Sequence, residues 1–281
     1  MEKQKRFFTT LMLMLLSGLL TGLYAQKHIE LKYKVNKGDV YQYNMNIDQD
    51  IVFDAGGQTM ALDQLMDFRM TSKVTDKAED DFTVTSAIDA IKMTQGIFGM
   101  QITYDSEDPT SLENPMVAKI AETLSELIGA EYTMVMDNKG HVKEIDASAF
   151  SQNNDIANNI SSGSNYAVYP EGKIGIGDTW DGDVTPLENS DMKVNMSYTL
   201  LKISGKQATI GLTGTIKANN MDGDELRLDG TVSGEMTVST QTGWLIKSVI
   251  DQEIELDLEQ NGQTFPATIS GMITTTSEKM K

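Results

Sequence analysis

Apolar and polar residues alternate with a period of two along most of this chain, and this pattern constrains the fold more than any other feature. In residues 29–35, for example, Ile29, Leu31, Tyr33 and Val35 alternate with charged residues. The pattern recurs in further segments, whose apolar members are Tyr41, Tyr43, Met45, Ile47, Ile51 and Phe53; Phe68, Met70 and Val74; Phe82, Val84 and Ile88; Met192, Val194, Met196, Tyr198 and Leu200; and Ile210, Leu212 and Ile216. Successive side chains of a strand point to opposite faces, so each segment predicts a strand with one buried face.

Sheets with one buried and one solvated face are typically antiparallel, whereas parallel sheets show continuous apolar runs and alternate with helices. This chain shows neither of the latter features. We therefore expect a mainly β protein. The two architectures that fit are one large curved antiparallel sheet and two packed half-barrels.

Residues 115–128 break the alternation and predict one α-helix. Asn114 is a favourable N-cap, Pro115 suits the first helical position, and Gly129 is typical of the residue after a helix end. The apolar residues Val117, Ile120, Ala121, Leu124, Leu127 and Ile128 recur at helical spacing. We expect this stripe to pack on the sheet as core. The alternative is that it forms a lid over a lipid-sized cavity.

Aspartate and asparagine followed by glycine predict tight turns between the alternating segments, because these residues tolerate the positive φ that hairpins need. Such turns are expected at residues 137–140, 181–182, 222–223, 229–230 and 261–262.

The polar stretch of residues 151–165 divides the mature chain into two halves, residues 26–150 and 166–281. Residues 37–43 (KGDVYQY) resemble residues 176–182 (IGDTWDG), and a hairpin pattern near the end of the first half resembles residues 237–251. We interpret the halves as a duplicated β-meander, with the helix inserted in the first copy.

Residues 1–25 have the pattern of a signal peptide. Lys3, Lys5 and Arg6 precede an uncharged run of residues 7–23, and Ala25 suits the cleavage point. The alternative is an uncleaved membrane anchor, but the run is short for a bilayer span of about 20 residues. The chain has no cysteine, and a bacterial lipoprotein needs one at its cleavage junction. We therefore expect an exported periplasmic or extracellular protein that is not a lipoprotein and whose mature chain does not span a membrane.

The mature chain is strongly acidic. The whole chain has 23 Lys and Arg against 41 Asp and Glu; removing the three basic residues and the one acid of residues 1–25 leaves 20 against 40, a net charge of −20. Phosphate binding needs clustered basic residues, so nucleic acid is excluded as a partner.

Residue types for catalysis or metal binding are scarce. His28 and His141 are the only histidines, and no motif for a nucleophile accompanies them. Two acidic loops, residues 178–183 and 222–225, have the composition of calcium loops but lack the full spacing. We expect no enzyme, no cofactor and no metal site, and interpret these loops as turns.

The strongest charge feature is an alternating acidic strand. The residues Asp251, Glu253, Glu255, Asp257 and Glu259 lie two apart and therefore project from one strand face. We interpret them as a solvated outer face. The alternative is a docking face for a cationic partner or divalent ions.

Several segments resemble a family of uncharacterised secreted proteins of Bacteroidota. They are the Ala25-Gln26 junction, residues 37–45 (KGDVYQYNM), 104–106 (YDS), 113–116 (ENPM) and 132–142 (YTMVMDNKGHV). The resemblance implies no activity. A curved antiparallel sheet with one helix is also similar, at the level of fold, to periplasmic lipoprotein carriers.

These observations lead to three functional hypotheses. The first is a non-enzymatic envelope protein that binds a lipid, another apolar ligand or an apolar segment of a protein partner. The second is an interaction module that docks a cationic envelope component through the acidic strand. The third is a hydrolase of unrecognised type, which would need paired carboxyl groups in a cleft. The oligomeric state stays open.

Overall fold

The structure is a computed structural model that describes residues 28–54, 57–97, 99–149, 166–184, 192–221, 224–260 and 263–281. The strands are β1 (Val40–Asp54), β2 (Thr59–Ala78), β3 (Asp81–Ile97), β4 (Met100–Asp105), β5 (Glu131–Asp137), β6 (Val142–Asp146), β7 (Thr179–Val184), β8 (Lys193–Ser204), β9 (Gln207–Met221), β10 (Asp224–Ser239), β11 (Leu245–Gln260) and β12 (Gln263–Lys279). A 3₁₀ turn, η1 (Pro109–Glu113), precedes helix α2 (Pro115–Ser125). The expected signal peptide, the linker and the turns at 222–223 and 261–262 lie outside the described residues.

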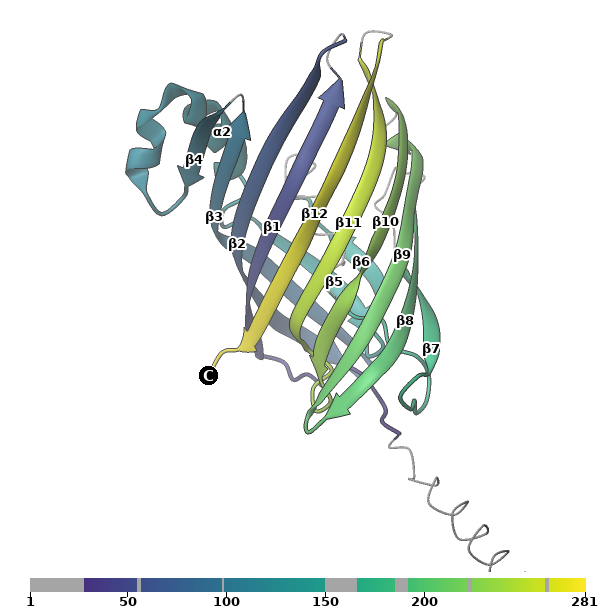
Figure 1. The fold of residues 1–281 in the computed structure, drawn as a ribbon. Coiled ribbons are helices and arrows are strands. Elements are labelled where there is room, and N and C mark those ends of the chain that lie inside the picture. Colours follow the sequence, from purple (N-terminus) through teal and green to yellow (C-terminus); the bar gives the residue numbers. More distant parts are fainter. Residues whose placement is uncertain are drawn as a thin grey trace, which may run out of the picture.

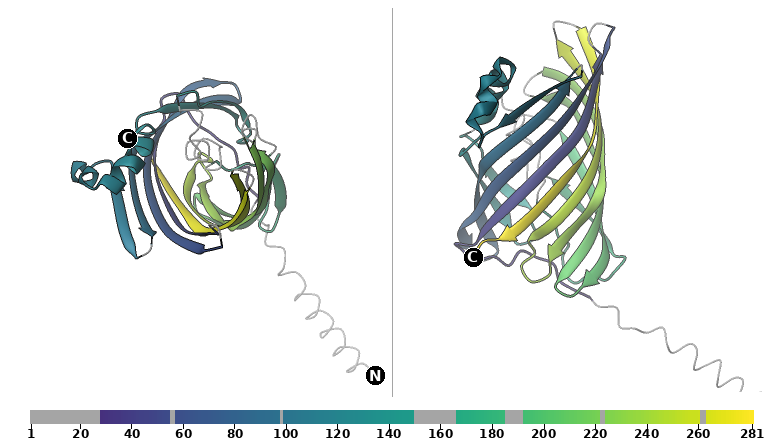
Figure 2. Two further views of the ribbon diagram at one scale, coloured as in Figure 1. Left: turned by 90° about the horizontal axis from the view of Figure 1, so that it is seen from above. Right: turned by 60° about the vertical axis from the view of Figure 1, so that its left-hand side comes forward.

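All twelve strands belong to one antiparallel sheet with the order β6-β5-β3-β2-β1-β12-β11-β10-β9-β8-β7, and β4 also pairs with β3. The sheet curls strongly, so that one of its faces is concave (Figures 1 and 2). This confirms the mainly β prediction and the large curved antiparallel sheet; the described strands do not form two packed half-barrels. Among the described residues, no helix has the length and apolar character needed to cross a membrane.

Each half of the chain contributes one meander, and the two meanders join where β1 pairs with β12. The register of this pair runs from Tyr41 opposite Lys279 to Phe53 opposite Ala267. The first and last strands therefore meet at the centre of the sheet, where an exposed strand edge would otherwise be left unpaired. The duplication of the two halves stays a prediction.

The helix begins as expected and ends earlier. The Asn114 side chain accepts a hydrogen bond from Met116 N, which confirms the N-cap. The helix ends at Ser125 and not at residue 128, because Leu127 and Ile128 donate to the carbonyls three residues back and Gly129 then takes a φ of +76°. The apolar stripe is buried or partly buried in the main core, as the core interpretation predicted.

Two of the expected turns are wrong. The hairpin at residues 137–140 is confirmed, with Gly140 at a φ of +92°. Gly182 instead lies inside β7, and Gly230 lies inside β10 opposite Ile254. A Cβ at Gly182 would lie 2.8 Å from Tyr198 Cε2. Glycine at this position therefore permits close packing within a strand, which a local Asp-Gly signal does not distinguish from a turn.

Residues 28–39, the purple segment before β1, cross the lower end of the sheet in Figure 1. Tyr33 N donates to Asn138 O in the β5–β6 turn, and Lys34 N donates to Thr242 O in the β10–β11 turn. This segment therefore ties together two turns that belong to opposite arms of the curved sheet.

Tyr33 of this segment belongs to an aromatic cluster, whose other members are Tyr41, Tyr43, Phe82, Tyr166, Tyr169 and Trp244. The Trp244 ring stacks on Tyr41 with the ring centroids 3.9 Å apart. Tyr33 meets Trp244 edge to face at 5.8 Å, an arrangement that aromatic quadrupoles favour. The cluster draws on both halves of the chain, and all of its members are buried.

Candidate functional site

The concave face is the first candidate site, because several of its inward apolar side chains near the upper end are only partly buried. Near the lower end, inward residues such as Tyr43, Met70 and Ile210 are at most 4% exposed. Nearer the upper end, the inward residues Ile51, Val194, Ile216, Leu228, Val232, Ile254, Leu256 and Ile269 are only partly buried. The upper concave face therefore presents apolar surface that the described parts of the chain do not fully cover.

Charge is segregated between the two faces of the sheet. In the described upper parts of β1, β2, β11 and β12 the acidic residues Asp48, Asp50, Asp63, Asp251, Glu253 and Glu255 all lie in the outward register. The inward positions between them carry apolar residues, glycine or glutamine. This placement makes the concave face free of formal charge in that region.

The inward glutamines were missed by the sequence interpretation. Gln49 follows Ile47 and precedes Ile51 in the inward register, and its Nε2 donates to Gln64 Oε1 at 2.7 Å. The signal that would have found them is a polar residue in the apolar phase of an alternating segment, which is unusual for a core strand.

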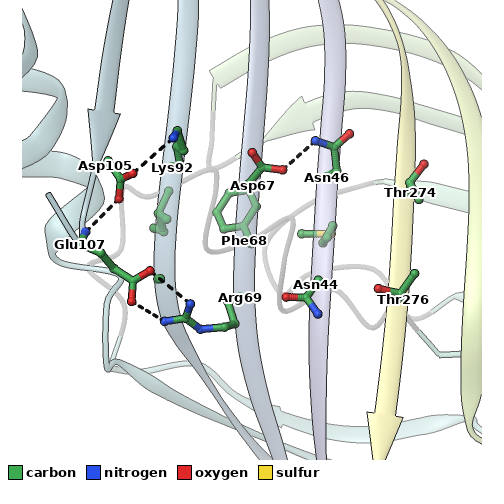
Figure 3. A pocket seen from close by; sticks show the side chains of 13 residues that line it. Asn44, Asn46, Asp67, Phe68, Arg69, Lys92, Asp105, Glu107, Thr274 and Thr276 are labelled. Atoms are coloured by element: carbon green, nitrogen blue, oxygen red, sulfur yellow. Dashed lines mark hydrogen bonds and ion pairs between the residues drawn. The ribbon is translucent and has the colours of Figure 1, made fainter. Parts of the chain in front are cut away.

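A second candidate site is a polar pocket of about 360 Å³ on the convex face (Figure 3). It lies over β1, β2, β3 and β12 and is bordered by the segment after β4. The labelled side chains that line it are Asn44, Asn46, Asp67, Phe68, Arg69, Lys92, Asp105, Glu107, Thr274 and Thr276. Register alone brings these residues together, since they come from five separate segments.

The charged groups of this pocket satisfy one another. Arg69 forms a two-pronged contact with Glu107, with nitrogen–oxygen distances of 2.7 and 3.2 Å. Lys92 Nζ lies 3.4 Å from Asp105 Oδ2. The hydrogen bond from Arg69 lowers the pKa of the exposed Glu107 carboxyl, which keeps it ionised. A general acid needs the opposite shift, so the paired carboxylates here have the properties of surface ion pairs.

The two histidines differ in their surroundings. His28 is exposed. His141 Nδ1 lies 2.9 Å from Asp137 Oδ2, and Asp137 Oδ1 accepts from the backbone nitrogens of Lys139 and His141. Burial raises the pKa of Asp137, but these hydrogen bonds together lower it below the ordinary value. The pair therefore organises the β5–β6 turn. The described residues contain no group of three or more side chains suited to holding a metal ion.

The acidic strand lies on the convex face of β11, as its alternation predicted. Asp251, Glu253 and Glu255 are exposed and lie opposite Ser233, Thr231 and Asp229 of β10. Asp257 has Arg227 at 3.8 Å, and the side chain of Glu259 lies outside the described ones. Docking of a cationic partner or of divalent ions on this face stays a prediction.

Helix α2 lies at the flank of the sheet beside β4 in both views of Figure 2. Its stripe residues Val117 and Leu124 are 1% exposed, and Ile102 and Tyr104 of β4 belong to the same core cluster. A lid movement would have to break these contacts, and the lid stays a prediction.

Comparison with known families shows to which family the chain belongs. A family model described as a family of unknown function, DUF6263, matches residues 79–149 and 149–245. The chain belongs to this family. A search of curated proteins found no match.

Several solved structures align with most of this chain. A lipovitellin structure matches this DUF6263 member with a TM-score of 0.52 and 10% identity, over 87% of this chain and 25% of that chain. The chain thus spans about a quarter of the length of the lipovitellin chain. The translocator domain of the autotransporter NalP from Neisseria meningitidis (TM-score 0.23, 7% identity, 87% of this chain and 90% of that chain) and a DUF1329 protein from Desulfovibrio piger (0.15, 12%, 84% and 84%) are more distant. At such identity the lipovitellin match shows the fold alone.

Proposed function

We propose that this protein is a non-enzymatic binding protein that holds an apolar ligand against the upper concave face of its sheet. The observation that carries the proposal is the set of partly buried apolar side chains on the upper concave face, where the inward positions of β1, β2, β11 and β12 carry no formal charge. Covering such surface releases about 25 cal/mol per Å² of apolar area removed from water, which favours occupation by a hydrocarbon.

The comparison with lipovitellin supports the same proposal. That structure is described by its lipid–protein interactions, and it matches 87% of this chain with a TM-score of 0.52. The aromatic cluster at the lower end is buried, so the incompletely covered apolar surface available to a ligand lies at the upper end.

Export of the protein is part of the proposal. Residues 1–25 combine a basic start, an apolar run and a small residue at Ala25, which supports cleavage near this point and a periplasmic or extracellular location. Sequencing the N-terminus of protein purified from its native source should give a chain that begins near Gln26. An intact N-terminus in the cytoplasm would contradict this part.

Native mass spectrometry of the gently purified protein tests ligand binding. We expect a bound mass that organic solvent extracts, and displacement of the neutral dye Nile red by added lipid. Ile254→Arg places a charge on the concave face and should weaken dye binding at least tenfold, because an unpaired charge is costly to bury. Glu253→Arg adds the same side chain on the convex face of the same strand and should leave dye binding unchanged. An empty protein that binds neither dye nor lipid would refute the proposal.

A further inference from the structure

Four inward glutamines lie at one level of the concave face. The register places Gln252 of β11 opposite Gly271 of β12, Gly271 opposite Gln49 of β1, Gln49 opposite Gln64 of β2, and Gln64 opposite Gln95 of β3. We call Gln252, Gln49, Gln64 and Gln95 the glutamine row. Neighbouring strands are about 4.8 Å apart. The row therefore spans five strands, and Gly271 of β12 interrupts it between Gln252 and Gln49.

Apolar residues border the glutamine row on both sides. The inward residues one step toward the lower end are Ile250, Ile273, Ile47, Met66 and Met93, and those one step toward the upper end are Ile254, Ile269, Ile51 and Leu62. The row is thus one polar band within an apolar wall.

The hydrogen-bonding capacity of the row is only partly used. Gln49 Nε2 donates to Gln64 Oε1, and Gln64 Nε2 lies 3.8 Å from Met93 Sδ, which is a weak acceptor. Gln95 and Gln252 are partly buried, and their side-chain amides have no hydrogen-bond partner among the described residues. Partly buried amides without partners favour a ligand that supplies them.

Charge determines which ligand chemistry fits. The row consists of neutral amides, which both donate and accept hydrogen bonds, and no charged side chain of the described strands lies in the adjoining inward positions. An ionised headgroup would lose its hydration there without gaining a counter-charge. An anionic headgroup would also be repelled by a chain whose formal net charge is −18.

We infer that the ligand is an uncharged amphiphile, whose ester, amide or hydroxyl group hydrogen-bonds to the glutamine row while its hydrocarbon chain lies on the apolar rows beside it. This inference rests on the proposed function and names the ligand class for the same face. The glutamine row fixes the position of the polar group of the ligand along the concave face, because the inward residues on both sides of the row are apolar.

Three probes with the same hydrocarbon length separate the contributions of the headgroup and the chain. They are monoolein, oleate and octadecene, measured by displacement of Nile red from the full mature chain. We expect the wild type to bind monoolein more tightly than the other two. Gln49→Met and Gln64→Met should weaken monoolein binding about three- to tenfold, the effect of one lost hydrogen bond, and leave octadecene binding unchanged.

Gln42→Met is the matched control, since Gln42 lies on the same strand in the outward register; it should bind all three probes as the wild type does. Circular dichroism checks that each variant folds, and Gln252→Met replaces any variant that does not. Tighter binding of oleate, or an equal loss for all probes in the row variants, would overturn the assignment of the row while leaving apolar binding intact. Failure of every probe would overturn both.

Discussion

Tyr33 and Tyr41 belong to the same aromatic cluster but use their hydroxyl groups differently. Tyr33 OH donates to Ala167 O at 3.1 Å and accepts from Ala167 N at 2.9 Å, so one side chain satisfies both backbone groups of a buried residue. Tyr41 OH is buried and has no hydrogen-bond partner among the described residues. The energetic value of a buried hydroxyl depends on such partners, because an unmatched polar group still loses its water.

We therefore predict opposite outcomes for one substitution at the two sites. Tyr33→Phe should lower the free energy of unfolding by about 1–3 kcal/mol, since it strands the N–H and C=O of Ala167. Tyr41→Phe keeps the ring that stacks on Trp244 and should change stability by less than about 0.5 kcal/mol, or increase it. Urea unfolding followed by tryptophan fluorescence measures both. Equal losses at the two sites would contradict the hydrogen-bond explanation.

The strands curl where inward glycines let neighbouring backbones approach. At Gly271 of β12, an added Cβ would lie 2.4 Å from Asp48 O and 2.7 Å from Gln49 Cα of β1. At Gly234 of β10, it would lie 2.1 Å from Val249 O of β11. Glycines within strands mark such bends and close approaches. The curvature of the concave face thus depends on a few positions without a side chain.

Gly271→Ala should destabilise the protein by about 2–4 kcal/mol, because the new methyl group meets backbone that cannot rotate away. Gly96→Ala is the matched control within β3, where the nearest atom to a Cβ is Asp63 Oδ2 at 3.4 Å; it should cost less than about 1 kcal/mol. Thermal unfolding by circular dichroism compares the two variants. A Gly271→Ala protein as stable as Gly96→Ala would show that the strands can separate there without cost.

The whole molecule is held together at its lower end by buried tyrosines from both halves. Burial raises the pKa of Tyr41 to about 12 and that of Tyr198 to about 12. It also raises the pKa of Tyr33 and of Tyr43 well above 10. The folded state therefore keeps these hydroxyls protonated at a pH where the unfolded chain releases the protons.

This difference predicts alkaline unfolding. The stabilisation is complete below pH 10, the ordinary pKa of tyrosine, and is lost as the pH rises from 10 toward 12. For Tyr198 alone the complete loss is about 3 kcal/mol, since its pKa rises from 10 to about 12 and one pKa unit corresponds to about 1.4 kcal/mol. Urea unfolding at a series of pH values should show a constant free energy between pH 7 and about pH 9 and a steep fall above pH 10. Tyr198→Phe should make the fall shallower, and an unchanged slope would exclude Tyr198 as a contributor.

Particular elements show how far sequence patterns reach. Asn114 and Gly129 predicted the start of the helix and the turn after it, because capping depends on neighbours within a few residues. The assignment of side chains to the buried and the solvated face of each strand was correct for the same reason. The Asp-Gly pair at Gly182 was misread, since the close contact with Tyr198 that requires glycine there comes from the paired strand β8. The residues of the convex pocket and the glutamine row were not recognised, because register between strands brings each set together.

The alternation of side chains was therefore determined by the sequence alone: an extended backbone turns each side chain to the opposite face, so local order settles which residues are buried. The tertiary structure decided the rest. The pairing of β1 with β12 joins residues more than 200 positions apart, and only that register brings Gln252, Gly271 and Gln49 to one level. Such alignment depends on the relative positions of whole strands, and a shift of one strand by one residue would turn its glutamine to the convex face.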